Sequence, residues 1–321
     1  QVNKKFIMLK KILPGILFLL ITSNFLYSQT NTTYNFLRLD VGARASALSG
    51  SFTAMENDVN VIFYNPAGIA TLKDKQASVG FYKYLLDINS GNAAYVQKYK
   101  DIGYIGAGIQ YINYGSFDKY DVNSNNLGTF GASDIALSLG YGNVYNNLFY
   151  GGNLKIIYSS YDSYKSSAVA VDLGAMYKIQ KANMTLGLSL LNVGTQITSY
   201  QDYKENLPMD LRFGLTKKLE NSPLTLSVGF YALSDSYDKF FNRFKNVTAG
   251  AEFEISDNIN FRVGYDNQLR QELKTGSAIG IGGFSAGLGV KLQEKYQIDY
   301  GFNSMGKLGS THRINVGFLL N

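Results

Sequence analysis

From about residue 75 to the end of the sequence, apolar residues recur at every second position. In residues 259–266, for example, Ile259, Phe261, Val263 and Tyr265 alternate with polar or small residues. Successive side chains of a β-strand point to opposite faces, so each such segment has one apolar face and one polar face. Residues after 75 show no comparable helical periodicity. The sequence therefore predicts an all-β fold for this part of the chain.

The alternating segments number about 14, which is an even number. We expect strands at residues 76–84, 91–99, 102–113, 131–142, 148–160, 166–179, 183–193, 208–218, 223–234, 246–255, 258–268, 278–292, 295–304 and 311–320. The even-numbered joins are tight, whereas the odd-numbered joins are mostly longer, at 114–130, 194–207, 235–245 and 269–277. Short turns at one end and long loops at the other are typical of outer-membrane barrels. A soluble β-sandwich also alternates, but it rarely needs so many strands in up-and-down order. We therefore predict a single transmembrane β-barrel of about 14 antiparallel strands over residues 76–321.

Residues 1–28 have the pattern of a secretory signal peptide. Lys10 and Lys11 precede an apolar run at residues 12–21, and a more polar stretch leads to Ser28, after which we expect cleavage. Ten apolar residues are too few for a membrane-spanning helix, which needs about 20. Gln1 is not a start residue, so we expect Met8 as an alternative initiator. The pattern predicts export, and with the barrel it predicts an outer-membrane location.

Residues 29–75 do not alternate and are expected to form a segment of their own. Asn65, Pro66, Ala67 and Gly68 form a strong turn signal within it. The segment could be a periplasmic tail, or it could fold back into the barrel as a plug. The predicted inward face of the strands is rich in glycine and leaves space in the lumen, which favours the plug, or hatch.

Charged residues of both signs also fall on the predicted inward face. The candidate lumen charges are Asp134, Asp172, Arg212, Arg262, Asp299 and Arg313. Charged side chains are tolerated inside such a barrel when they form ion pairs or are hydrated. We expect cross-strand ion pairs, with a selective ion pathway as the alternative.

The composition argues against catalysis and against nucleic-acid binding. The chain has no Cys and one His, which excludes thiolate metal sites and multi-histidine centres and disfavours a Ser-His-Asp site. Four of the 30 Lys and Arg residues lie before residue 29, which leaves 26 against 24 Asp and Glu. Nothing marks His312 as a catalytic base, and the oxygen-rich stretch 118–126 lacks the spacing of a calcium loop. We therefore expect no enzyme activity, no cofactor and no metal.

Four sequence blocks carry a family resemblance. FLRLDVGARASALSGSFTAMENDVNVIFYNPAG at residues 36–68, followed by a barrel of this size, resembles the FadL-like outer-membrane proteins. Within them it looks most like the PorV/PorQ family of the type IX secretion system. Residues 102–141, 207–227 and 283–302 are similar to the PorQ pattern. The resemblance covers nearly all of the expected mature chain.

The resemblance implies a 14-stranded barrel with an N-terminal hatch that contains Asn65, Pro66 and Gly68. It also implies a role in the attachment complex at the cell surface, where PorQ-like barrels are associated with the large surface protein PorZ, alongside PorU and PorV. The expected function is therefore docking of a PorZ-like protein by a barrel set in outer-membrane lipid. The alternative, by the wider FadL analogy, is transport of hydrophobic small molecules, which rests on fold alone.

Aromatic residues in the predicted loops are the candidate partner-binding residues. They are Tyr114, Phe117 and Tyr120 in the second extracellular loop, Tyr200 and Tyr203 in the fourth, and Tyr237, Phe240 and Phe241 in the fifth. Aromatic anchors dominate the energetics of protein interfaces. The alternative is that these rings belong to the outer girdle of the barrel or pack against neighbouring loops.

Overall fold

A computed structural model of the chain describes residues 32–274 and 280–320, and the predicted signal peptide lies outside these residues. Fourteen antiparallel strands form a closed barrel, which confirms the predicted fold class. The strands are β1 (Lys75–Lys83), β2 (Asn89–Tyr99), β3 (Gly103–Tyr120), β4 (Asn126–Tyr145), β5 (Leu148–Tyr161), β6 (Tyr164–Ile179), β7 (Met184–Thr198), β8 (Asp210–Lys218), β9 (Leu224–Phe230), β10 (Val247–Ser256), β11 (Ile259–Asp266), β12 (Phe284–Leu292), β13 (Tyr296–Ser304) and β14 (Ser310–Leu320).

Each strand pairs with the strands next to it in sequence, and β14 pairs with β1 to close the wall. Along β1, Ser78 points inward and is buried, while its neighbour Val79 points outward and is exposed. This alternation is the one that the sequence shows. It gives the barrel an apolar outer face, as expected where a wall meets lipid.

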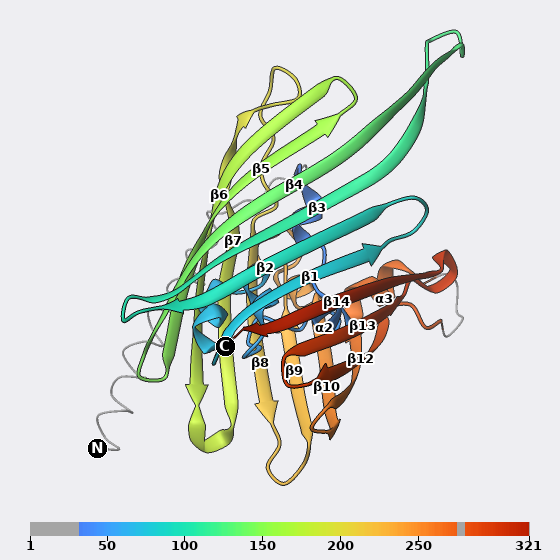
Figure 1. The fold of residues 1–321 in the computed structure, drawn as a ribbon. Helices are drawn as coiled ribbons and strands as arrows, with labels where there is room; N and C mark the ends of the chain where they lie inside the picture. Colours follow the sequence, from blue (N-terminus) through green and yellow to red (C-terminus); the bar gives the residue numbers. More distant parts are fainter. Residues whose placement is uncertain (1–31, 275–279, 321) are drawn as a thin grey trace.

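The strands fall into two groups by length. Strands β3 to β7 have 14 to 20 residues each, and we call them the tall wall. Strands β8 to β14, β1 and β2 have 7 to 11 residues, and we call them the short wall. A transmembrane strand needs roughly 9–11 residues, so the tall wall extends beyond a bilayer. Figure 1 shows the β3–β4 hairpin standing farthest out.

The joins between strands define a loop end and a turn end of the barrel. The odd-numbered joins lie at the loop end, and the long ones are residues 199–209, 231–246 and 267–283. They carry the 3-10 helix η6 (Phe240–Lys245) and the helix α3 (Asn267–Glu272), while the short η7 (Gly306–Leu308) lies in the last join. The even-numbered joins, including η5 (Gln180–Ala182), lie at the turn end. The predicted long loop at residues 114–130 is wrong, because β3 and β4 continue through most of it and leave only residues 121–125 as their join.

Residues 32–74, which we call the inner segment, fill the barrel. They form the 3-10 helix η2 (Asn35–Arg38), the helix α2 (Ala43–Ala47) and the 3-10 helices η3 (Val59–Phe63) and η4 (Pro66–Thr71). Phe52, Ile62 and Ile69 of this segment are fully buried. Figure 1 shows these short elements in blue, enclosed by the strands. None of the helices in the described residues is long and apolar enough to cross a membrane.

Candidate functional site

The turn at Asn65 fixes the inner segment to the tall wall. The Asn65 side chain accepts a hydrogen bond from the backbone N–H of Ala67 at 3.1 Å and so caps η4, which begins at Pro66. Its Nδ2 donates to the carbonyl of Thr53 at 2.8 Å and to the carbonyl of Ala175 in β6 at 3.2 Å. The predicted turn residues Asn65, Pro66, Ala67 and Gly68 are all buried here. The side chain of Asn65 therefore joins the inner segment to the barrel.

Glycines of the wall let the backbone of the inner segment approach closely. Gly142, Gly151 and Gly174 lie opposite one another on β4, β5 and β6. A Cβ on Gly174 would overlap the Asn65 side chain and come within 2.9 Å of Pro66 Cδ. A Cβ on Gly151 would come within 2.6 Å of the Pro66 carbonyl oxygen. The space beside these glycines is therefore occupied by the inner segment.

Charges fix the inner segment to the short wall. The guanidinium of Arg44, in α2, pairs with both carboxylate oxygens of Glu252 in β10 at 2.8 Å. Arg262 in β11, which is fully buried, donates to Glu252 at 2.6 Å and to Asp299 in β13 at 2.6 Å. Arg44 also contacts Asp58 at 3.2 Å. Arg262 and Asp299 of the candidate lumen charges thus belong to one buried network with the inner segment.

The other candidate lumen charges are buried at separate places. Asp172 pairs with Lys155 at 3.0 Å, and Arg212 pairs with Asp210 at 2.7 Å. The guanidinium of Arg313 lies 3.5 Å from the centre of the Tyr82 ring and donates to Ser46 of α2 at 2.7 Å. Asp134 lies at the loop end, on the tall wall, and lines a cavity.

A cavity of about 420 Å³ opens at the loop end, against the inner face of the tall wall. We call it the tyrosine cavity. It is lined by Thr32, Thr33, Tyr34, Asn35, Tyr114, Asp134, Tyr161, Tyr164, Tyr200, Gln201, Tyr203 and Glu205. The volume falls within the range of roughly 300–1,000 Å³ that is usual for small-molecule sites. Of the aromatic residues predicted from the loops, Tyr114, Tyr200 and Tyr203 are brought together here, while Tyr34, Tyr161 and Tyr164 were not predicted.

Hydroxyl groups hold the buried carboxylate of Asp134 in the cavity wall. The Tyr114 hydroxyl donates to Asp134 Oδ2 at 2.7 Å, and the Ser159 hydroxyl donates to Oδ1. The Tyr200 hydroxyl donates in turn to Ser159 Oγ. Burial raises the pKa of Tyr200 to about 12, so this hydroxyl keeps its proton at neutral pH. The network presents one carboxyl group with neutral hydroxyl partners.

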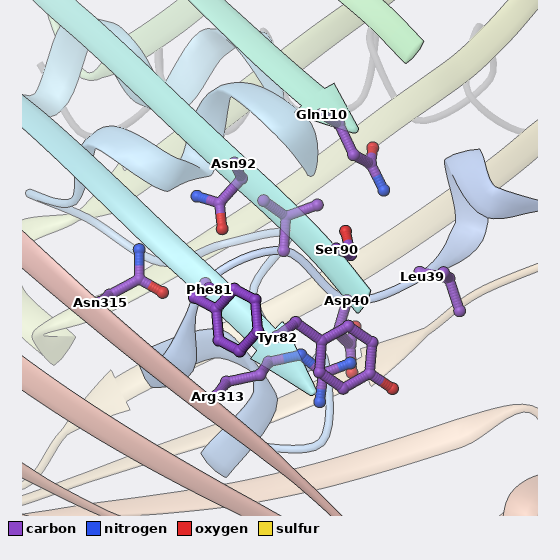
Figure 2. Close-up of a pocket in the computed structure, with 11 residues that line it drawn as sticks. Leu39, Asp40, Phe81, Tyr82, Ser90, Asn92, Gln110, Arg313 and Asn315 are labelled. Carbon is purple, nitrogen blue, oxygen red and sulfur yellow. The ribbon is translucent and has the colours of Figure 1, made fainter. Parts of the chain in front are cut away.

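Two further cavities border the inner segment. A cavity of about 670 Å³ at the turn end is lined by charged and polar residues, among them Lys178, Lys218 and Glu254. A third, of about 10 Å³, lies beside Asp40 and has room for no more than a water molecule. Figure 2 shows Asp40 near Arg313 and Tyr82 in this third cavity. Burial raises the pKa of the Asp40 carboxyl, although Arg313 and Arg212 partly offset that effect.

The remaining predicted aromatic residues lie in two different places. Phe117 and Tyr120 are exposed side chains of β3, so their placement in a loop is wrong, as it is for Tyr114. Phe117 stacks on Phe130 of β4 with the ring centres 5.4 Å apart. Among the described residues, neither edge of the hairpin has a strand partner in this part, because the ladder with β2 ends at Asn113 and the ladder with β5 ends at Ala132, although the Gly131 carbonyl accepts a hydrogen bond from the Asp162 N–H at 3.2 Å.

Phe240 and Phe241 lie in η6, in the loop between β9 and β10. They pack against Phe244, which contacts Phe230 with ring centres 6.0 Å apart. Phe230 is on the outer face of β9, directly opposite Phe213 on β8. The rings of η6 therefore continue the outer face of the wall. The Tyr237 hydroxyl, in the same loop, donates to the carbonyl of Ala232 at 3.0 Å.

Within residues 32–274 and 280–320, no group of three or more His, Asp or Glu side chains is arranged to hold a metal ion. His312 lies on the outer face of β14, where its ring contacts the Tyr300 hydroxyl at 2.7 Å.

Comparison with known proteins gives a family and a fold. The family described as "Uncharacterised protein family (UPF0164)" matches residues 23–317. No curated protein matches the chain. The structure is similar to that of a FadL homologue from Pseudomonas aeruginosa, with a TM-score of 0.57, 10% identity, and coverage of 88% of this chain and 98% of that one.

Two toluene transporters are similar in the same way. TodX from Pseudomonas putida has a TM-score of 0.57 and 13% identity, covering 86% of this chain and 96% of that chain. TbuX from Ralstonia pickettii has a TM-score of 0.54 and 11% identity, covering 86% and 96%. These identities are low, so the likeness extends to the fold, which is that of outer-membrane barrels of the FadL type.

Proposed function

The chain belongs to the UPF0164 family, and we propose that it is a non-enzymatic outer-membrane barrel, similar to PorQ, that docks a surface protein of the type IX secretion system. Because short turns face the periplasm in such barrels, the loop end faces the cell exterior. The partner is a PorZ-like protein, next to PorU and PorV in the attachment complex. The proposal joins the sequence resemblance to one feature of the fold, the β3–β4 hairpin.

The hairpin carries the proposal because it offers an exposed, ordered surface beyond the wall. Phe117, Tyr120, Val122 and Leu127 are all exposed on it, and Val122 is fully so. Its two edges, which have no strand partner among the described residues, also present backbone groups that another chain can extend by strand addition. Lys119 ties the hairpin to the β5–β6 turn through Asp162 at 2.5 Å. A hairpin held in this way is suited to a protein partner.

The rings of η6 have a different role in this proposal. Phe240 and Phe241 continue the outer face of the barrel, and Lys239, Arg243 and Lys245 stand among them. Aromatic and basic residues at the edge of a barrel suit the interface of a membrane. We therefore assign these rings to contact with outer-membrane lipid.

Transport of a hydrophobic small molecule is the second candidate. It is favoured by the likeness to barrels that include toluene transporters. Against it, the inner segment is packed against the wall by glycine contacts and ion pairs, and charged side chains line the cavity at each of its ends. These observations favour docking.

A pull-down of the tagged barrel from native outer membranes, in mild detergent, tests the proposal. We expect an equimolar large surface protein that is lost in Phe117→Ser/Tyr120→Ser. The matched variant, Phe240→Ser/Phe241→Ser, removes two exposed rings from another loop and should keep the partner. A barrel that is recovered alone, with a bound fatty acid or hydrocarbon, would instead support transport.

A further inference from the structure

The charges around the tyrosine cavity are all of one sign. Asp134 and Glu205 line it, and none of the twelve described lining residues is Lys, Arg or His. Neither carboxylate forms an ion pair within the described part of the chain. Lys165 and Lys204 are next to lining residues in sequence, but they do not line the cavity. The cavity therefore has two carboxyl groups in its lining and no cationic side chain to pair with them.

Asp134 is placed where leaving a charge without a counter-ion is costly. Asp134 is only 5% exposed, and in the part of the chain that the structure describes its two oxygens accept hydrogen bonds from the Tyr114 and Ser159 hydroxyls. Most buried charges in proteins are paired with an opposite charge. A cationic ligand in the cavity would supply the missing partner.

Six tyrosine rings line the cavity, and they favour an organic cation over a small inorganic one. Tyr114 and Tyr161 have ring centres 6.0 Å apart, and Tyr34 and Tyr200 have theirs 6.4 Å apart. Aromatic faces attract organic cations, and cages of such rings recognise quaternary ammonium groups and methylated lysine. A small inorganic cation would be better served by water or by several carboxylates.

We propose that the tyrosine cavity binds an organic cation, with an ammonium or guanidinium group set against Asp134 among the tyrosine rings. The cation is either a free small molecule or the Lys or Arg side chain of another protein. The inference uses only the cavity and does not depend on the docking function, so a failed pull-down would leave it standing.

The sequence offers a clean reporter for a binding experiment. The chain contains no Trp, so Tyr203→Trp at the exposed rim would place a single tryptophan beside the cavity. The purified full chain in detergent would be titrated with choline and with its neutral isostere 3,3-dimethyl-1-butanol. Maltose serves as a sugar control, and Nα-acetyl-lysine amide and Nα-acetyl-arginine amide as side-chain probes.

We expect choline to change the tryptophan emission saturably and the neutral isostere and maltose to leave it unchanged. Asp134→Asn, made in the Tyr203→Trp background, should weaken choline binding at least about tenfold, as expected for the loss of a charged partner. Glu205→Gln should weaken it less, since Glu205 is only half-buried. Binding of the lysine or arginine amide as tight as that of choline would indicate a protein side chain, and choline binding alone would indicate a free ammonium compound.

Three results would overturn the inference. They are equal binding of choline and 3,3-dimethyl-1-butanol, unchanged choline affinity in both Asp134→Asn and Glu205→Gln, and saturable binding of maltose alone. Because Glu205→Gln changes a residue near the rim, it keeps the test valid if the buried Asp134→Asn variant does not fold. Glu254→Gln at the turn end is the control for a general change in charge.

Discussion

The tall wall and the short wall hold the same inner segment by different interactions. Against the tall wall, η4 lies on the row Gly142, Gly151 and Gly174, with uncharged backbone and side-chain atoms close to these glycines. Against the short wall, α2 is held by Arg44 in a network with Glu252, Arg262 and Asp299. Close glycine contacts occur on both walls, since Gly214, Gly264 and Gly301 of the short wall also meet the inner segment, but the buried ion network with the inner segment is on the short wall.

The tall wall supports the inner segment by close steric contact, whereas the short wall also attaches it through buried charged side chains. The tall wall also carries the hairpin and four of the residues that line the tyrosine cavity, Tyr114, Asp134, Tyr161 and Tyr164. Steric fit responds little to salt or pH. A buried ion network depends on every member, because removing one leaves its partner charged and desolvated.

The largest effect is expected for Glu252→Gln in the short wall. The change leaves Arg44 and Arg262 without their shared carboxylate, and breaking a buried pair in this way costs about 3–5 kcal/mol. The free energy of unfolding, measured by urea titration of the purified barrel in detergent, checks this. Glu254→Gln is the matched control, since its pair with Lys218 is exposed and such pairs contribute at most about 1 kcal/mol. Equal losses in the two variants would contradict the charge network.

Gly174→Ala is expected to have the next largest effect. The new Cβ would press on Asn65 and Pro66, and overpacking of this kind costs about 1–3 kcal/mol. Because no charge is involved, the loss should be the same at low and high salt, as measured in the same urea titration. Gly91→Ala is the control, because its Cβ would meet its nearest neighbour, the Gly80 carbonyl oxygen, at 3.7 Å. A salt-dependent loss in Gly174→Ala would break the contrast between the walls.

Asp40→Asn is expected to have the smallest effect, and with the opposite sign. Burial raises the pKa of Asp40 in the folded state, so the folded state holds this proton more tightly than the unfolded chain does. The ionised carboxylate therefore lowers stability as pH rises above about 4, the ordinary value for Asp. Asp40→Asn should be slightly more stable than the parent at pH 7 and equal to it at pH 3. A less stable variant at pH 7 would show that Arg313 outweighs burial.

The sequence predicted the barrel well because its signal is local. The apolar and polar faces of each strand can be read from the alternation of its residues, as for Ile259, Phe261 and Val263 in β11. The even number of segments also agrees with the closed barrel. The hairpin beyond Asn113 escaped prediction because both of its faces are exposed. Such a segment shows no apolar face, and its Asn, Asp and Ser residues are typical of loops.

The tyrosine cavity could be predicted only in part. Tyr114, Tyr200 and Tyr203 stood out as aromatic residues near the loop end, but their meeting with Tyr34 and Asp134 depends on how the inner segment lies in the barrel. Alternation along a strand carries no information about a contact between residues 132 positions apart, such as that between the Tyr34 and Ser166 hydroxyls. A concentration of Tyr near the loop end was the one signal that pointed to the place.

The glycine contacts also bear on the order in which the protein assembles. Gly187 and Gly214 meet Thr53, Gly264 meets Leu48, and Gly301 meets Ala43, so the wall touches the inner segment along most of its circumference. A segment fitted this closely could not be threaded through a finished cylinder. A fit of this closeness favours pairing of β14 with β1 around an inner segment that is already in place. In this order of assembly, the inner segment is the surface around which the strands of the barrel close.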